Sequence, residues 1–587
     1  MRQCPRRMII RAVGEASQTQ GRPRERFLYD RDLQLTRTDL WAWTDAVRRV
    51  ETPASAGHTS ELLEAMRDPQ FYDADPHDTV ELRETHSSWV FLVDERAFKL
   101  KKPLVLPFLD YSSVERRRLM CQREVALNRP LAGDLYRGVR SIVRRGGRLR
   151  LAADTPDGIE HVVEMRRYDE DATLAAALAR GLISPGDIRP IAERLARFHA
   201  GSAVHRHGAG TVARLKRAID GNFETLLAQR DLVDPVRVLS AQRFVDAFLA
   251  GHGALLVGRD RAGWVRECHG DLRAKHVLLG EQVQIVDCIE YADDLREIDV
   301  AEDLALLIMD LTRGGRPDLA RSLAAHYRAA GGNPGSDQML AFHAAVGAWA
   351  RAKLAALRAV DPMAAKSTRM DAAAGARELF GIGEHLSWQA RLPLALIVCG
   401  PPAAGKTALA AALAERSGLP VLSADEIRRR IAGLEARERA PRGAHAQPPN
   451  ERTYLELGRL AAEQLAATGG VIVDATFGQR QMREAFASAF GEATPALFCE
   501  CRAPLDVLRR RARAQLSERR RISDEGLSLS TRLAERFDPL EADIAAQHHL
   551  VLRADQPPAE VSDDLVAMLD RHLARAPVAS TTTEAPA

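Results

Sequence analysis

Residues 394–416 read LALIVC, then GPPAAGKT, then ALAAALAER. An apolar run is followed by a Gly-rich loop and a run with helical spacing, which predicts a strand, a phosphate-binding loop and a helix in succession. The loop matches GxxxxGK[ST], whose glycines let backbone N–H groups turn toward phosphate oxygens at the positive end of a helix. An incidental Gly-rich turn is the alternative, and the complete motif in this context disfavours it. The residues predicted to bind nucleotide are Gly400, Pro401, Pro402, Ala403, Ala404, Gly405, Lys406 and Thr407.

Lys406 is predicted to reach the β- and γ-phosphates and to act in catalysis, and Thr407 is predicted to bind Mg²⁺. A second apolar run, residues 471–473, ends in Asp474. Many strands end in Asp simply to begin a turn. Because this one follows a convincing phosphate loop, we predict that Asp474 holds the metal or its water.

Two features further along the chain are candidates for acceptor binding. Asp425 and Arg428 stand three residues apart at a predicted helix start. There, Asp425 would orient an acceptor hydroxyl as a catalytic group and Arg428 would bind a phosphate; a plain helix N-cap is an equally good interpretation. Arginines crowd residues 509–513 and form either a solvated face or a lid on the transferring phosphoryl group. In the second case, Arg511 and Arg513 contact the substrate.

These residues resemble the P-loop kinase group that includes polynucleotide kinases and zeta toxins. The resemblance covers about 390–550 and rests on GPPAAGKT, on SADEIR at 423–428 and on VDATF at 473–477 followed by Arg483. It implies phosphoryl transfer from ATP to a hydroxyl, with Asp425 as the base-like residue and Arg428 on the acceptor.

A separate constellation lies nearer the N-terminus. His269-Gly-Asp-Leu272 precedes a short predicted strand, and a second short strand, Val283–Val286, runs into Asp287. Phosphoryl transfer from Mg·ATP uses one carboxylate to accept the hydroxyl proton and another to hold the metal. Asp271 and Asp287 are therefore predicted to share a catalytic site.

The same stretch resembles aminoglycoside phosphotransferases and related protein-kinase-like enzymes. The resemblance implies that Asp271 is the catalytic residue and that Asp287 binds the metal. It also implies that Lys99 grips the α/β-phosphates and that Glu124 is its ion-pair partner. Lys101 shares the strand face of Lys99 by period-two alternation, and we favour Lys99. By the same resemblance, residues 162–166 form the adenine-binding hinge, and two later acids, Asp299 and Asp303, are structural.

One position departs from this family. Its members carry Asn five residues after the catalytic Asp, where this chain has His276. Magnesium prefers oxygen ligands whereas imidazole suits softer metals, so His276 predicts a metal site that is weakened, water-mediated or biased toward Mn²⁺. Arg273 and Lys275 are close enough to Asp271 to offset developing phosphate charge.

The patterns predict an α/β multidomain chain: a protein-kinase-like α+β fold of two lobes, then a P-loop NTPase with a parallel sheet. We predict a poorly ordered extension at 1–56, a kinase-like domain at 57–385 with its small lobe to about 165, a P-loop domain at 386–575 and a disordered tail at 576–587. The combination resembles a bacterial family described as bifunctional aminoglycoside-phosphotransferase-like and ATP-binding (AAA family ATPase) proteins, over about 57–550.

Composition narrows the classes of function. The formal net charge is +3, which gives no global electrostatic reason to bind nucleic acid or an anionic membrane. The chain carries neither a membrane-spanning apolar run nor a secretory leader pattern, so a cytoplasmic protein is expected. Of 83 basic residues only eight are Lys, which suggests that a retained Lys serves as a point charge, as at a phosphate. Those lysines are Lys99, Lys101, Lys102, Lys216, Lys275, Lys353, Lys366 and Lys406.

The leading hypothesis is a kinase with two Mg·ATP sites that transfers a phosphoryl group to a small-molecule or nucleotide hydroxyl. Its cofactors are ATP and Mg²⁺, and no motif identifies the acceptor. One alternative makes the kinase-like part a non-catalytic sensor that regulates the P-loop NTPase. Another is a nucleic-acid-end kinase that uses the arginines at 428–442 and 509–521; near-neutral charge and the lack of interleaved aromatics disfavour it.

Overall fold

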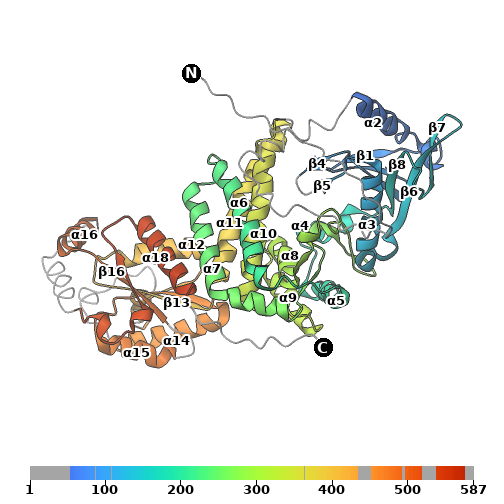
Figure 1. Cartoon of the computed structure of the whole chain (residues 1–587). Helices are drawn as coiled ribbons and strands as arrows, with labels where there is room; N and C mark the ends of the chain where they lie inside the picture. The colour runs from blue at the N-terminus through green and yellow to red at the C-terminus, as the bar shows by residue number, and fades with distance from the viewer. Residues whose placement is uncertain are drawn as a thin grey trace, which may run out of the picture.

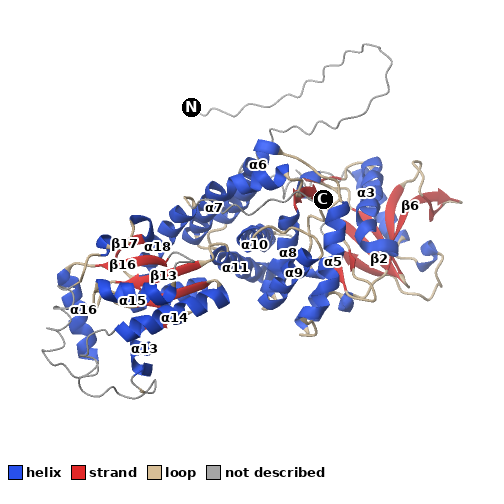
Figure 2. Ribbon diagram, turned by 90° about the horizontal axis from the view of Figure 1, so that it is seen from below, coloured by secondary structure: helices blue, strands red, loops and turns tan. Residues whose placement is uncertain are grey.

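The computed structural model describes residues 53–575, except 86, 107–108, 363, 432, 434–450, 492–495 and 519–536. Within these ranges it shows a mainly β lobe, a helical lobe and a separate parallel-sheet domain (Figures 1 and 2). The predicted fold class is confirmed: a two-lobed kinase-like fold precedes a P-loop fold. The predicted tail and almost all of the predicted extension lie outside the described residues.

The small lobe is built on an antiparallel sheet in the order β1-β2-β3-β8-β6-β7. Its alternating apolar residues include Phe91 and Phe98, both fully buried. Helix α3 (Val114–Ala132) begins where the Ser113 hydroxyl accepts from the Arg116 N–H at 3.2 Å, and it packs on β8 and β6. Helix α2 (Pro53–Ala65) precedes the sheet. The strands are β1 (Glu81–Glu84), β2 (Ser88–Val93), β3 (Arg96–Lys101), β6 (Tyr136–Arg145), β7 (Arg148–Ala153) and β8 (Glu160–Arg166).

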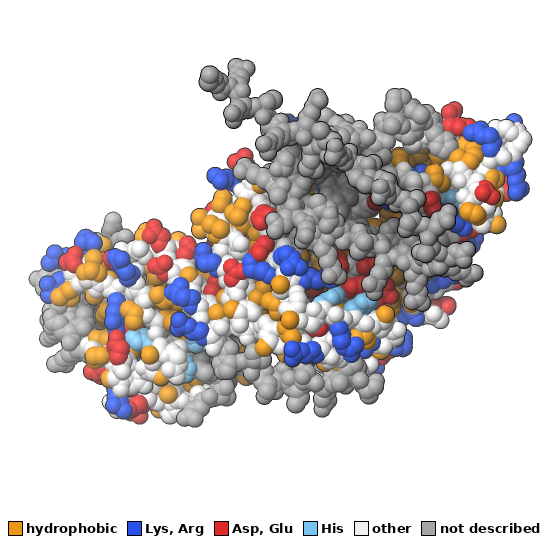
Figure 3. All heavy atoms as spheres, in the orientation of Figure 1, with side chains coloured by type: hydrophobic (Ala, Val, Ile, Leu, Met, Phe, Trp, Pro, Cys, Tyr) orange, Lys and Arg blue, Asp and Glu red, His pale blue; other side chains and the backbone are white. Residues whose placement is uncertain are grey.

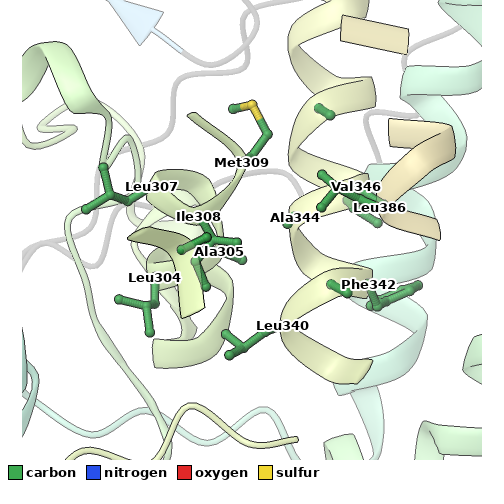
Figure 4. Close-up of a cluster of buried hydrophobic side chains, with 14 of the residues drawn as sticks. Leu304, Ala305, Leu307, Ile308, Met309, Leu340, Phe342, Ala344, Val346 and Leu386 are labelled. Carbon is green, nitrogen blue, oxygen red and sulfur yellow. The ribbon is translucent and has the colours of Figure 1, made fainter. Parts of the chain in front are cut away.

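The large lobe is helical and carries two short strand pairs. Its core lies between α8 (Val300–Arg313), α10 (Asp337–Ala359) and α11 (Lys366–Gln389), and Figure 4 shows part of the cluster of buried hydrophobic side chains that packs there. The strand pairs place the loops that carry the predicted catalytic acids. They are β9 (Val265–Glu267) with β12 (Glu297–Asp299), and β10 (Val277–Leu278) with β11 (Gln284–Ile285).

The remaining helices of this lobe surround that core. They are α4 (Leu174–Ala179), α5 (Pro185–Gly201), α6 (Thr211–Ala228), α7 (Pro235–Arg261) and α9 (Pro317–Ala329).

The C-terminal sheet is wholly parallel, with strand order β14-β15-β13-β16-β17. Its central strand β13 (Leu394–Cys399) is buried at every position because helices cover both faces. The other strands are β14 (Val421–Ser423), β15 (Gly470–Asp474), β16 (Ala496–Arg502) and β17 (His549–Arg553). The helices are α12 (Lys406–Ser417), α13 (Ala424–Ile431), α14 (Glu451–Thr468), α15 (Arg480–Phe490), α16 (Leu505–Glu518) and α18 (Pro558–Leu573).

A buried ion pair joins the helical lobe to the P-loop domain. The Nε of Arg391, just after α11, donates to the Asp570 carboxylate on α18 at 3.1 Å, and its guanidinium lies 4.3 Å from the centre of the Phe244 ring on α7. Close by, Gly251 of α7 touches the α18 backbone: a Cβ there would lie 2.4 Å from the Leu573 carbonyl oxygen. The two domains are therefore packed together at this junction.

The described surface carries mixed charge. On the face shown in Figure 3, basic and acidic side chains are interspersed over the helical lobe and the P-loop domain, in keeping with the net charge of +3. None of the described helices combines the length and apolar character that crossing a bilayer requires.

Candidate functional site

The kinase-like half gathers three predicted residues from distant parts of the chain. Lys99 of β3 places its Nζ 2.8 Å from the Glu124 carboxylate on α3 and 2.8 Å from the Asp287 carboxylate, which follows β11. The Lys99 charge holds the pKa of Asp287 well below its usual range. The structure therefore brings the predicted phosphate-binding lysine, its ion-pair partner and the predicted metal ligand to one point.

Lys101 points into the interior and has a different role. Its side chain is fully buried and its Nζ contacts Glu124, at 2.7 Å, together with Glu290 and the Tyr111 hydroxyl. Lys99 and Lys101 thus bind the two oxygens of one Glu124 carboxylate. Only the Lys99 end of this chain of contacts reaches Asp287, so the geometry favours Lys99 for the nucleotide.

Substituting each lysine by methionine should separate these roles. Lys99→Met is expected to weaken nucleotide binding with little change in stability, because Glu124 keeps Lys101 as its partner. Lys101→Met leaves the buried Glu290 carboxylate without its cation and Glu124 with Lys99 alone, which is expected to destabilise the fold by about 3–5 kcal/mol. Nucleotide titration and denaturant unfolding of both variants measure the two effects. Equal stability losses, or wild-type affinity in Lys99→Met, would contradict this assignment.

The loop that carries Asp271 is held by a buried acid. The backbone N–H groups of His269 and Gly270 each donate to the Asp303 carboxylate at 2.9 Å, and His199 contacts that carboxylate at 3.1 Å. Gly270 has φ +82°, and a Cβ there would lie 2.6 Å from the Leu295 carbonyl oxygen, so the turn requires glycine. Asp303 therefore fixes the backbone just before the predicted catalytic residue.

Asp271 is paired with a residue that the motifs did not indicate. Arg351, on α10, forms an ion pair with the Asp271 carboxylate. Burial raises the pKa of Asp271, but the charge and hydrogen bond of Arg351 and the charge of Arg273 outweigh it and lower the pKa below its usual value. Asp271 is thus a carboxylate at neutral pH. The only sequence signal for Arg351 was a basic residue within the apolar stretch of α10.

His276 lies between the two predicted catalytic acids. Its Nδ1 is 2.8 Å from the Asp271 carbonyl oxygen, which can only accept, so Nδ1 carries the proton. Burial lowers the pKa of His276 to about 4, and the imidazole is neutral at pH 7. Nε2 then presents a lone pair, buried without a hydrogen-bond partner, 3.5 Å from a carboxylate oxygen of Asp287. Two electron-rich atoms that face each other suit a divalent cation shared by His276 and Asp287.

This ligand pair predicts a metal preference. In a Lys406→Ala background that silences the other half, turnover by the kinase-like half is expected to be higher with Mn²⁺ than with Mg²⁺. His276→Asn should shift the Mn²⁺/Mg²⁺ activity ratio toward Mg²⁺ by about tenfold, because an amide oxygen replaces the imidazole nitrogen. Steady-state rates across both metal titrations measure the ratio. An unchanged ratio would show that His276 does not contact the metal.

The predicted phosphate loop curls at the start of α12. Its backbone has positive φ at Gly400 (+133°), Ala403 (+64°) and Gly405 (+98°). A Cβ at Gly400 would lie 2.6 Å from the Cys501 carbonyl oxygen, so β16 packs directly against the loop. Lys406 donates from Nζ to the Pro401 carbonyl oxygen at 3.0 Å and thus folds back over the loop.

The two side chains predicted to bind the metal at this loop also lie together. The Thr407 hydroxyl donates to the Asp474 carboxylate at 2.7 Å, since β15 runs beside β13 and ends level with the loop. Burial raises the pKa of Asp474 and lowers that of Lys406. Both shifts reflect charged groups partly withdrawn from water, the environment in which a polyphosphate and a metal are bound most strongly.

The residues predicted to bind the acceptor differ in their exposure and in their contacts. Arg428 donates to Asp425 at 2.8 Å on α13, and the Asp425 side chain is 82% exposed. On α16, Arg511 donates to the carbonyl oxygens of Ala404 and Ala554 and so touches the loop, whereas Arg513 is exposed. The arginines at 519–521 lie outside the described residues.

Arg483, which belongs to the P-loop kinase resemblance, is buried in a bidentate pair with Asp543 (2.6 and 2.7 Å). It also donates to the Phe477 carbonyl oxygen at 2.8 Å. Arg483 therefore ties α15 to the chain before β17.

A cavity of about 420 Å³ lies between α3 and α5. Its lining includes Arg194, Phe198, Cys268 and Cys288 but none of the predicted site residues.

Comparison with known proteins supports the predicted combination of a kinase-like part and a P-loop part. A family model described as an AAA domain matches residues 396–540. The uncharacterized protein Rv2004c of Mycobacterium tuberculosis and the uncharacterized protein Mb2027c of Mycobacterium bovis are each 34% identical over 442 residues, which is 73% of this chain and 85% of theirs.

Among solved structures, a microcompartment-associated aminopropanol kinase is 14% identical and covers 56% of this chain and 98% of its own (TM-score 0.33). A choline/ethanolamine kinase family protein of Mesorhizobium loti is 14% identical and covers 54% and 97% (TM-score 0.31). A gluconokinase of Sinorhizobium meliloti is 20% identical and covers 31% and 94% (TM-score 0.23).

Proposed function

This chain belongs to the family of the mycobacterial proteins Rv2004c and Mb2027c. Because it joins a kinase-like part to a P-loop part, we propose that it is an ATP-dependent phosphotransferase with two nucleotide sites. The observation that carries the proposal is that each half holds a lysine beside a carboxylate suited to a metal. These pairs are Lys99 with Asp287 and Lys406 with Asp474. The acceptor is a small-molecule or nucleotide hydroxyl.

In the kinase-like half, Lys99 would bind the α- and β-phosphates of ATP, steadied by Glu124. Asp287 and His276 would hold Mg²⁺ or Mn²⁺, which when bound neutralises charge on the transferred phosphate. Asp271 accepts the proton of the acceptor hydroxyl. The acceptor oxygen then forms a bond to the γ-phosphorus, the bond from that phosphorus to the ADP oxygen breaks, and ADP leaves.

In the P-loop half, backbone N–H groups of residues 400–407 would surround the phosphates at the N-terminus of α12. Lys406 would swing from the Pro401 carbonyl onto the β- and γ-phosphates, and Thr407 with Asp474 would hold the metal. Asp425 would orient the acceptor hydroxyl beside Arg428.

The proposal is tested by incubating metabolite pools with [γ-³²P]ATP and either the wild-type chain or the doubly substituted Asp271→Ala, Lys406→Ala chain. Labelled products are expected with the wild type and absent with the double variant. Labelling that survives in the double variant, or a wild-type chain that neither binds nor turns over nucleotide, would refute the proposal.

A further inference from the structure

The surroundings of Asp271 in the kinase-like half are rich in cations. Arg273 and Lys275 follow Asp271 in the same loop, and Arg351 reaches it from α10. Lys275 stands between Ala274, whose N–H donates to Asp310 at 3.0 Å, and His276, whose Nδ1 lies 2.8 Å from the Asp271 carbonyl oxygen, so it belongs to the same region.

Acidic groups on the packed elements balance these cations only in part. Asp310 of α8 lies 3.7 Å from the Arg273 Nε and accepts from the Ala274 N–H at 3.0 Å. Asp287 already faces Lys99. Arg313, at the end of α8, is held by Glu378 at 2.7 Å. Three cations, Arg273, Lys275 and Arg351, therefore surround Asp271 and Asp310, while the charge of Asp287 is divided between Lys99 and Lys275.

Two of these guanidinium groups retain unused hydrogen-bonding capacity. The Nε atoms of Arg273 and Arg351 are buried without a hydrogen-bond partner, and the Arg351 side chain is only 12% exposed. An unsatisfied buried donor is unfavourable, and a ligand that supplies an acceptor removes that cost. Guanidinium forks match the oxygens of phosphates and carboxylates. A polycationic acceptor would instead meet like charge.

We infer that the acceptor of the kinase-like half is an anionic hydroxy compound, one that already carries a phosphate or carboxylate group, and that Arg351 and Arg273 bind this group. The inference rests on the proposed function and names the substrate class of that site. When the oxyanion takes Arg351, Asp271 loses its cationic partner and is free to accept the hydroxyl proton. Binding of the correct acceptor thus releases the base.

Calorimetric titration of the full chain tests this inference. The Lys406→Ala background is loaded with AMP-PNP and Mg²⁺ and titrated with inorganic phosphate. Saturable binding is expected, weakened about tenfold or more by Arg351→Met and by Arg273→Met, because each substitution removes a charge-assisted contact. Arg358→Met, an exposed arginine on the same helix, is the matched control and should keep wild-type affinity. Melting temperature and AMP-PNP affinity report whether each variant is folded.

Matched ligands distinguish the source of the anionic group. Glucose 6-phosphate is compared with glucose, gluconate with sorbitol, and kanamycin serves as the cationic ligand. Tighter binding of either anionic member supports the inference and tells phosphate from carboxylate. The inference is overturned if phosphate does not bind, or if the Arg351→Met and Arg273→Met variants bind phosphate as tightly as the unsubstituted background. A preference for the neutral or cationic ligands also overturns it. Failure of the proposed function has a different signature: AMP-PNP binding that Lys99→Met leaves unchanged.

Discussion

Asp271→Asn is expected to lower the rate at which the kinase-like half forms its product by about 10²–10⁴-fold, the contribution of a general base. The amide keeps the size of the side chain but cannot accept the proton. Nucleotide affinity should stay within about twofold of wild type, because Lys99, Glu124 and Asp287 are untouched. Labelled product from [γ-³²P]ATP measures the rate, and equilibrium titration measures the affinity.

The matched control for this change is Asp134→Asn, an exposed carboxylate whose side chain is 84% accessible. It should behave as wild type. If Asp271→Asn kept full turnover, the kinase-like half would act as a sensor of nucleotide or ligand that regulates the P-loop half. Loss of one product with the other retained would establish two separate catalytic sites.

Lys406→Ala is expected to reduce nucleotide binding from two sites per chain to one and to lower transfer by the P-loop half by at least about 100-fold. The reason is electrostatic: the Lys406 ammonium sits in a partly dehydrated loop where no other lysine is available to replace it among the described residues. Equilibrium titration with labelled ATP gives the stoichiometry, and product labelling gives the rate.

Lys366→Ala serves as its control, since this lysine is exposed at the start of α11. It removes the same charge and should change neither quantity. A Lys406→Ala chain that still bound two nucleotides would mean that residues 400–407 do not hold a triphosphate.

Much of the fold could be predicted because its signals are local. The apolar run Leu394–Cys399 forms a strand with those bounds. Strand β7 was not predicted, since RLRLAA alternates arginine with leucine over only four residues and lies at a sheet edge. The preceding pair Gly146-Gly147, both at positive φ, was the usable hairpin signal.

The candidate site residues likewise divide into those that the sequence indicated and those that depend on tertiary packing. The resemblance to protein-kinase-like enzymes was enough to associate Lys99 with Glu124, and the strand that follows the phosphate-loop motif was enough to associate that loop with Asp474. Arg351 could not be predicted, because its contact with Asp271 spans 80 residues and depends on how α10 packs. The burial of Lys101 with Glu290 was missed for the same reason: period-two alternation puts both lysines on one face and cannot tell which one the rest of the protein covers.

The junction at Arg391 limits how this protein can be dissected. A fragment cut after Arg391, so that this residue stays with the kinase-like half, would strip Asp570 of its guanidinium partner and leave a buried carboxylate facing water or an apolar patch. It would also expose the α7 surface at Gly251 to solvent, where the end of α18 now packs. We therefore expect the two halves to fold as one cooperative unit, and neither is a natural candidate for recombinant production by itself.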